Sequence, residues 1–184
     1  DWGAHMIDII QWGLDKDNSG PVATIPAKDS KAMKGAQLVY EGGIHMMHGA
    51  GLGSSFYGTD GRVECHRGRL GLWLGDKHVA GNQGGEKVNL NQELDRIEAE
   101  YLKDAKVKLY DSNNHVGDFL QAMKSRKKPI TNEIVGARTS IACHLLNQTY
   151  YNQEAIAWNP QKNTFAKGGD PKWLTRNYRG DWKV

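Results

Sequence analysis

Hydrophobic residues recur every three or four positions between Trp2 and Leu14, with polar residues between them. This spacing predicts an amphipathic helix with one apolar face. Residues 15–21 are a cluster of turn formers, so we expect the helix to end near Gly13.

Short runs of β-forming residues separated by turns occupy the next part of the chain. We expect strands at Val22–Ile25, Gln37–Tyr40, Gly42–His48, Ser55–Gly58 and Arg62–His66. Because short turns join these strands, the sheet should be antiparallel. We expect a loop in the middle of the glycine-rich stretch Gly68–Gly85, although its leucines alternate as they would in a strand.

The second half of the chain is mainly helical. Helical spacing of apolar residues predicts a helix at Leu94–Leu102, one at Val116–Met123 that stops before Pro129, and one at about Asn132–Tyr150 with Ile134, Ile141, Leu145 and Leu146 buried. A hairpin around Asn159-Pro160 follows. Together these elements predict an α+β fold, in which a mostly antiparallel, open-faced sheet has helices packed on one face.

The C-terminal segment is aromatic and basic, with little periodicity. We interpret residues 168–184 as an arm that carries Trp173, Tyr178 and Trp182. We expect these aromatic residues to hold the arm on the domain surface or to dock it on a neighbouring subunit.

Composition limits the classes of protein that are compatible with this pattern. The chain has 184 residues, a formal net charge of +3 and 39% apolar residues, which suits one domain with one core, or one domain with an attached arm. Acidic and basic residues are mixed along the chain, so we expect no nucleic-acid partner. No run of roughly 18 apolar residues exists, so we expect no membrane span.

The first residues bear on localisation. The sequence starts at Asp1, inside the expected helix and without a Met, so we interpret it as a piece of a longer protein. An export signal could lie in the other part, and both cytoplasm and periplasm stay open. The two cysteines, Cys65 and Cys143, do not decide the redox compartment.

Three short motifs resemble ligand sites but lack an essential part. Gly49–Gly53 is followed by a strand-like segment, whereas a dinucleotide loop needs a helix there. Residues 15–20 resemble the start of a calcium loop, but Pro26 stands where the bidentate carboxylate is needed. The cations of Lys124–Lys128 suit a helix C-terminus, where they complement the helix dipole. We therefore expect no cofactor site and no metal site in this chain.

Asp1 and His5 form the candidate catalytic pair. Residues four apart on a helix project from the same face, and a carboxylate beside an imidazole favours general acid or base chemistry. The structural alternative places Asp1 at a helix N-terminus and packs His5 beneath Trp2 or Ile9.

The other histidines provide weaker evidence for a functional site. His45 and His48 point to opposite faces of a strand, so a shared zinc ion is not expected. His115 and His144 suit structural or interface roles.

The segment Asp1-Trp2-Gly3-Ala4-His5 resembles the D-x-x-x-H motif of the Gfo/Idh/MocA oxidoreductases, which include sugar and inositol dehydrogenases. The similarity continues through Phe56–Gly61, Asn114–Ile130 and Cys143–Leu145, and so covers essentially the whole chain. It implies a two-domain enzyme in which this chain is the C-terminal domain, residues 1–184, with a large, mostly antiparallel sheet. The first domain, a Rossmann fold that carries the Glu-Lys-Pro signature and holds NAD or NADP, is absent from this sequence.

The resemblance also implies roles for residues and partners. His5 would be the proton acceptor or donor for a sugar or polyol hydroxyl, Asp1 would orient that substrate, and the sheet face would form a dimer or tetramer. Two alternatives remain. One is a non-catalytic domain for dimerisation or carbohydrate binding, and the other is a hydratase or lyase that uses its cofactor transiently.

Overall fold

The computed structural model describes residues 2–51, 53–82, 87–106 and 112–181. The chain divides into two compact units. Unit 1 comprises residues 1–51 and 132–184, and unit 2 comprises residues 52–131.

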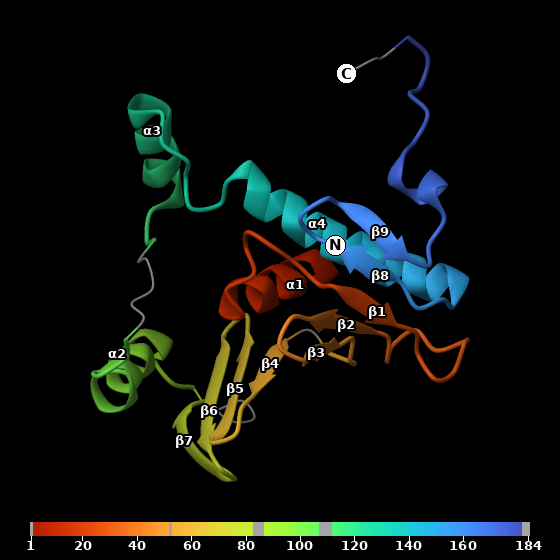
Figure 1. Ribbon diagram of the computed structural model, residues 1–184. Helices are drawn as coiled ribbons and strands as arrows, with labels where there is room; N and C mark the ends of the chain where they lie inside the picture. Colours follow the sequence, from red (N-terminus) through yellow and green to blue (C-terminus); the bar gives the residue numbers. More distant parts are fainter. Residues whose placement is uncertain (1, 52, 83–86, 107–111, 182–184) are drawn as a thin grey trace. The chain divides into compact units, whose positions relative to one another are not determined.

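Unit 1 contains a five-stranded antiparallel sheet, sheet A, with strand order β3-β2-β1-β8-β9 (Figure 1). Its strands are β1 (Ala23–Ile25), β2 (Gln37–Tyr40), β3 (Ile44–Met47), β8 (Ala157–Asn159) and β9 (Thr164–Lys167). The chain leaves the sheet after β3 and returns through helix α4 (Glu133–Asn152), so β8 pairs with β1 from the far end of the sequence.

Helices α1 (Trp2–Gly13) and α4 form the helical layer of unit 1. α4 begins at an Asn132 cap, whose side chain accepts a hydrogen bond from the backbone N–H of Ile134, and ends at Gln153 in the left-handed conformation. It contacts β1 and β2 as well as α1. The end of α1 at Gly13 confirms the predicted helix boundary.

The core of unit 1 lies between sheet A and these two helices. Leu38 and Tyr40 of β2 and Leu145 and Leu146 of α4 belong to one buried cluster, which Trp158 of β8 joins. Two of the four residues predicted to form the buried stripe of α4 are therefore in the core. Ile141 packs against the cluster while partly exposed, and Ile134 is 37% exposed because it lies in the first turn of α4.

Unit 2 contains a four-stranded antiparallel meander, sheet B, with strand order β4-β5-β6-β7. Its strands are β4 (Ser54–Tyr57), β5 (Gly61–His66), β6 (Arg69–Leu74) and β7 (Lys77–Gly81). The β4–β5 hairpin confirms the predicted pairing, with Phe56 opposite Val63.

The structure corrects the loop expected in the middle of Gly68–Gly85, because β6 and β7 occupy most of it. Glycine is needed there for packing. A Cβ at Gly81 would collide with the backbone carbonyl of Leu70, and a Cβ at Gly71 would collide with the Trp73 ring, which lies over it. The glycines that weaken the strand pattern in the sequence are thus the residues that let β6 and β7 approach closely.

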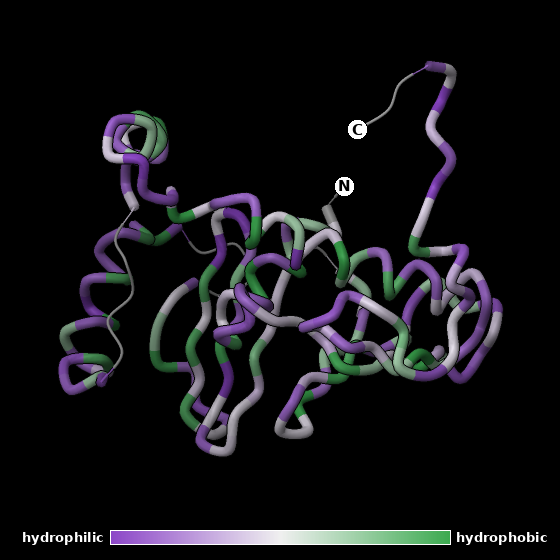
Figure 2. Tube along the Cα trace, turned by 45° about the horizontal axis from the view of Figure 1, so that its top comes forward, coloured by the Kyte–Doolittle hydropathy of each residue, from purple (hydrophilic) through white to green (hydrophobic). Residues whose placement is uncertain are grey.

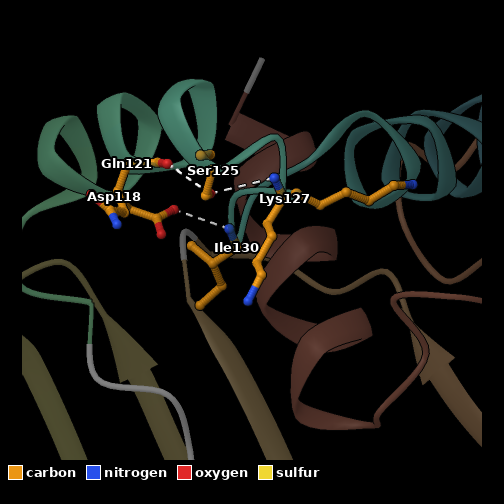
Figure 3. A pocket seen from close by; sticks show the side chains of 7 residues that line it. Asp118, Gln121, Ser125, Lys127 and Ile130 are labelled. Carbon is orange, nitrogen blue, oxygen red and sulfur yellow. Dashed lines mark hydrogen bonds between the residues drawn. The ribbon is translucent and has the colours of Figure 1, made fainter.

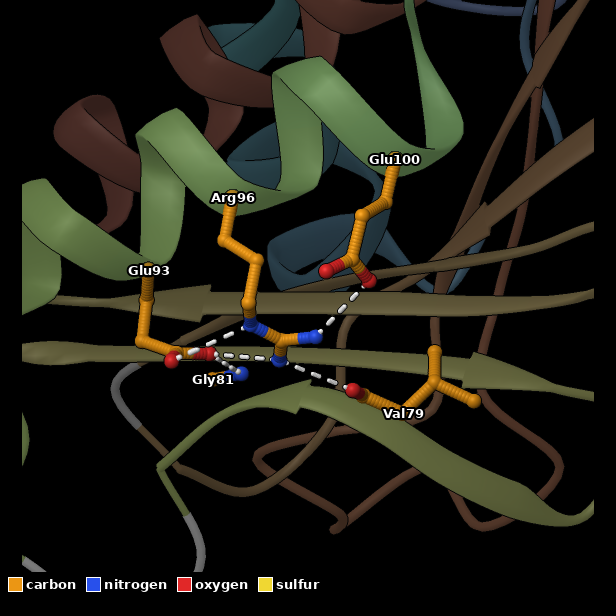
Figure 4. Close-up of polar contacts among 5 residues, drawn as sticks. All are labelled: Val79, Gly81, Glu93, Arg96 and Glu100. Atoms are coloured by element: carbon orange, nitrogen blue, oxygen red, sulfur yellow. Dashed lines mark hydrogen bonds and ion pairs between the residues drawn. The ribbon is translucent and has the colours of Figure 1, made fainter.

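Unit 2 also contains helix α2 (Leu90–Tyr101) and helix α3 (His115–Ser125). α2 covers the β7 edge of sheet B with two polar side chains (Figure 4). Glu93 accepts a 2.9 Å hydrogen bond from the backbone N–H of Gly81, and Arg96 donates one of 2.9 Å to the carbonyl oxygen of Val79. These contacts satisfy edge groups that a neighbouring strand would otherwise bind.

The expected arm begins with aromatic packing and then leaves the surface of unit 1. Trp158, Phe165 and Trp173 form a chain of edge-on ring contacts, with centroids 5.4 and 5.9 Å apart. After the short helix η1 (Pro171–Leu174), residues 175–181 have no regular secondary structure and are exposed. Trp182 lies outside the described residues.

The predicted fold class is confirmed: the protein is α+β, with four α-helices in the described ranges, two open antiparallel sheets, and helices that contact sheet A. The structure divides the strands between two sheets. None of the helices in the described part of the chain combines the length and the hydropathy that a membrane span needs.

Candidate functional site

Helix α1 presents two different faces. Ile7 and Gln11, four residues apart, are buried against the rest of unit 1. His5 and Trp12 are exposed, Trp12 to 48%. Because His5 and Trp12 are seven residues apart, they lie close to one line along the helix, on the side away from Ile7.

His5 is therefore a surface residue of α1. Asp1, the other member of the candidate pair, lies outside the described residues.

A second carboxylate, which the sequence analysis did not select, lies next to His5 on the helix surface. Asp8 is three residues after His5, a spacing at which side chains are neighbours on a helix. Its Oδ1 accepts a 2.6 Å hydrogen bond from the Thr139 hydroxyl on α4. The three-residue spacing from His5 could have identified Asp8, whereas nothing in the sequence connects it to Thr139.

The Asp8–Thr139 bond is a polar contact between α1 and α4, and two further titratable groups lie near Asp8. Cys143, one turn after Thr139, is half-buried there, and burial raises the pKa of its thiol, with a smaller effect in the same direction from Asp8. Asp17, just beyond α1, also has a raised pKa, first through burial and then through the charges of Asp8 and Asp15. The Asp8–Thr139 hydrogen bond therefore joins α1 to α4, and His5 is carried on the outer side of α1.

The residues after α1 form a turn, as expected. Asp15 adopts the left-handed conformation, and the backbone N–H of Lys16 donates to the carbonyl oxygen of Gln11 at 2.8 Å. Over the described ranges, no group of three or more His, Cys, Asp or Glu residues has an arrangement that could hold a metal ion.

His45 and His48 have partners on different elements. His45 Nδ1 lies 2.8 Å from Gln37 Oε1 on the neighbouring strand β2. His48 Nδ1 lies 2.8 Å from the Tyr150 hydroxyl on α4, and this hydroxyl also accepts a hydrogen bond from the backbone N–H of Ala36. Both histidines are thus engaged in contacts that hold sheet A and α4. His144 of α4 and His115 of α3 are exposed.

The glycine-rich segment Gly49–Gly53 precedes strand β4 and not a helix. The helix N-terminus that would face a pyrophosphate is therefore absent after this loop, in which Leu52 lies outside the described residues.

A cavity of about 330 Å³ in unit 2 is lined by one side of α3 and the segment after it (Figure 3). Asp118 accepts a 3.0 Å hydrogen bond from the backbone N–H of Ile130, and the Ser125 hydroxyl donates to the carbonyl oxygen of Gln121 at 2.8 Å. α3 ends at Ser125, followed by Arg126 in the left-handed conformation. The cations of residues 124–128 thus lie at a helix C-terminus, as predicted.

Comparisons with models of known protein families, with curated proteins and with solved structures give no match for this chain.

Proposed function

We propose that this chain is the C-terminal, substrate-binding and oligomerisation domain of an NAD(P)-dependent oxidoreductase that acts on a hydroxyl group of a sugar or polyol. The observation that carries the proposal is the exposure of His5 on the outer side of α1. A general acid or base must reach the proton that it transfers, and a histidine in the core could not do so.

In the proposed reaction the substrate C–OH group is oxidised to a carbonyl. NAD or NADP, when bound by the full-length enzyme, would supply the acceptor for the hydride that leaves the carbinol carbon. His5 accepts the hydroxyl proton and returns it in the reverse direction. Asp1 is proposed to orient the substrate, as the sequence resemblance implies.

The anchoring of α1 supports this role for His5. A catalytic side chain needs a fixed position relative to its substrate, and sites on rigid elements achieve this better than sites on loops. α1 is fixed by Ile7 and Gln11 in the interior and by the Asp8–Thr139 hydrogen bond to α4.

The cofactor is proposed to bind outside this chain. The one candidate dinucleotide loop, Gly49–Gly53, is followed by a strand, so these residues do not fit a dinucleotide. The resemblance implies that a preceding Rossmann domain holds NAD or NADP.

We propose the outer face of sheet A as the surface that forms the homo-oligomer. Ile25 of β1 and Met47 of β3 flank Gln37 of β2 in one row across the sheet, because the strand register pairs both with Gln37. Ile25 is 38% exposed and Met47 is 65% exposed, while the residues of β2 that alternate with Gln37 are buried beneath the helices. An antiparallel sheet with one uncovered apolar face is suited to pairing with a second copy.

An oxidation assay on the full-length gene product tests the activity. The protein is incubated with NAD or NADP and a panel of sugars and polyols, and both reduced nicotinamide and carbonyl product are measured. We expect both products in equal amounts for at least one substrate. Conversion of the sugar without accumulation of reduced nicotinamide would favour a hydratase or lyase, and no conversion would favour a non-catalytic domain.

Light scattering tests the oligomer. Met47→Lys together with Ile25→Lys should shift the protein towards the monomer, because two charges would be buried in the contact. The control is Met33→Lys, since Met33 is 87% exposed in the loop between β1 and β2 and should not affect assembly. A monomeric parent protein over a wide concentration range would contradict this part of the proposal.

A further inference from the structure

Helix α3 has an apolar face that no described element of unit 2 covers. None of its residues is buried. Four hydrophobic residues follow the i, i+3, i+4, i+7 pattern and are about half exposed: Val116 (56%), Phe119 (56%), Leu120 (50%) and Met123 (55%). Figure 2 shows the hydrophobic residues of α3 gathered on one side of the helix. The predicted helix is therefore confirmed, but the stripe that predicted it is exposed.

The opposite, polar side of α3 makes the contacts with its own chain. Asp118 and Ser125 bond to the segment that follows the helix, Asp118 to the backbone N–H of Ile130 and Ser125 to that of Lys127 (Figure 3). An isolated helix of this length is only marginally stable in water, and most helices are stabilised by packing of an apolar face. The arrangement in α3 therefore requires a partner for the stripe.

Helix α2 presents a matching apolar stripe. Its one buried residue is Ile97. Leu94 is 50% exposed, Tyr101 is 38% exposed and Leu102, at the helix end, is 48% exposed. Glu93 and Arg96, which hold α2 to β7, lie on a different side of the helix, so these contacts leave the stripe uncovered.

The charges beside the two stripes are opposite. α2 contains four acidic residues and one basic residue. Arg96 pairs with Glu93 and Glu100, whereas Asp95 and Glu98 form no ion pair with any described residue. Residues 124–128 contain four cations, of which Lys124, Arg126 and Lys127 likewise form no ion pair within the described ranges.

We propose that α2 of one copy packs antiparallel against α3 of a second copy. This orientation places Leu94 near Met123 and Tyr101 near Val116, and it brings Asp95 and Lys124 to the same edge of the contact. It also sets the dipoles of the two helices in opposite directions. Repetition of the contact across a two-fold axis covers both stripes in both copies and closes the dimer.

The α2 helix of a second copy is a better candidate partner for the α3 stripe than the α2 helix of the same chain. Both helices belong to unit 2, yet α3 buries no residue against α2 or against any other described element of unit 2. The proposal is independent of the proposed function, because it depends only on exposure and charge in unit 2, and the surface differs from the outer face of sheet A.

Disulfide trapping between two single-cysteine variants tests the contact. Leu94→Cys and Met123→Cys are prepared separately in a Cys65→Ala, Cys143→Ala background, mixed in equal amounts and oxidised. A disulfide in the mixture can form only between copies. We expect a covalent dimer from this mixture and at most a trace from a control mixture of Leu94→Cys and Val116→Cys.

Three results would overturn the proposal. One is the absence of a covalent dimer in the first mixture, and another is preferential linkage in the control mixture, which would exclude the antiparallel arrangement. The third comes from a single chain carrying Leu94→Cys and Met123→Cys: a disulfide within the monomer would show that the chain covers its own stripe. A dimer that survives through sheet A alone would leave the proposed function unaffected.

Charge exchange gives an independent test. Asp95→Lys with Glu98→Lys should weaken dimer formation about tenfold, as should Lys124→Glu with Lys127→Glu, because each pair of changes replaces attraction with repulsion at exposed sites. A chain carrying all four substitutions should recover most of the parental affinity. If the four changes weaken assembly additively, or if neither pair has an effect, the two charged edges do not meet.

Discussion

The Thr139 hydroxyl donates a 2.6 Å hydrogen bond to the Asp8 carboxylate, which joins α4 to α1 three residues after His5. Thr139 is 7% exposed, so little water is available to replace the bond. The orientation of α1, and with it the direction in which His5 projects, depends in part on this contact.

Thr139→Val should therefore destabilise unit 1. The substitution preserves the side-chain volume and removes the donor to a partly buried carboxylate, which costs about 1–2 kcal/mol of the free energy of unfolding. Urea unfolding followed by circular dichroism measures the change. The control is Ser140→Ala, on the exposed side of α4, where the hydroxyl donates a hydrogen bond to the carbonyl oxygen of Gly136 in its own helix. Equal stabilities of the two variants would show that the Asp8 contact does not stabilise the helix pair.

Tyr150→Phe should destabilise the other end of α4. The Tyr150 hydroxyl accepts a hydrogen bond from the backbone N–H of Ala36, a residue with 0% exposure, and it lies 2.8 Å from His48 Nδ1. Loss of the hydroxyl leaves a buried N–H without an acceptor, at a cost of about 1–2 kcal/mol. Thermal unfolding should show a lower midpoint for this variant. Tyr151→Phe is a close control, since Tyr151 is 78% exposed, and a similar loss there would contradict the explanation.

Acid should release α2 from β7. Hydrogen bonds from Arg96 and from the backbone N–H of Gly81 hold the pKa of Glu93 below its ordinary value of 4.5. A carboxyl whose pKa is lower in the folded state stabilises that state above the unfolded pKa, and this contribution is lost as the pH falls through the folded pKa. The contact should therefore persist at pH 5 and weaken in the range below about pH 4.5.

The amide resonance of Gly81 reports this change directly. Its chemical shift, followed by NMR against pH, should titrate with a midpoint below 4.5. Glu93→Gln should remove the titration, whereas Glu98→Gln should leave it in place because the Glu98 side chain forms no hydrogen bond or ion pair with β7 in the described residues. A midpoint at or above the ordinary value would contradict the role of Glu93.

Local patterns in the sequence predict the elements of this fold well, but not the contacts between distant segments. The end of α1 at Gly13 and the strand Gln37–Tyr40 follow from turn formers and β-forming residues. Strands β6 and β7 were not predicted because Gly71 and Gly81 carry no β-propensity, although their lack of a side chain is what the close packing requires. The exposed stripe of α3 shows a further limit, since periodicity identifies an apolar face and not the partner that covers it.

For the candidate site too, the sequence predicts local features but not contacts between distant segments. The four-residue spacing of Asp1 and His5 identifies a shared face of a helix, and the structure shows that His5 is exposed there. The hydrogen bond from Thr139 to Asp8 joins residues 131 positions apart, so only the fold brings them together.

The role of His5 is tested most directly by the kcat and the unfolding midpoint of His5→Ala, measured on the same samples of the full-length enzyme with its cofactor. His144→Ala serves as the control because His144 is also exposed. Because His5 lies on the surface, the substitution should change the free energy of unfolding by less than about 0.5 kcal/mol. If His5 transfers the hydroxyl proton, kcat should fall by roughly 10²- to 10⁴-fold while cofactor affinity stays nearly constant. A kcat within a few-fold of both the parent and His144→Ala would contradict the proposed function of this chain.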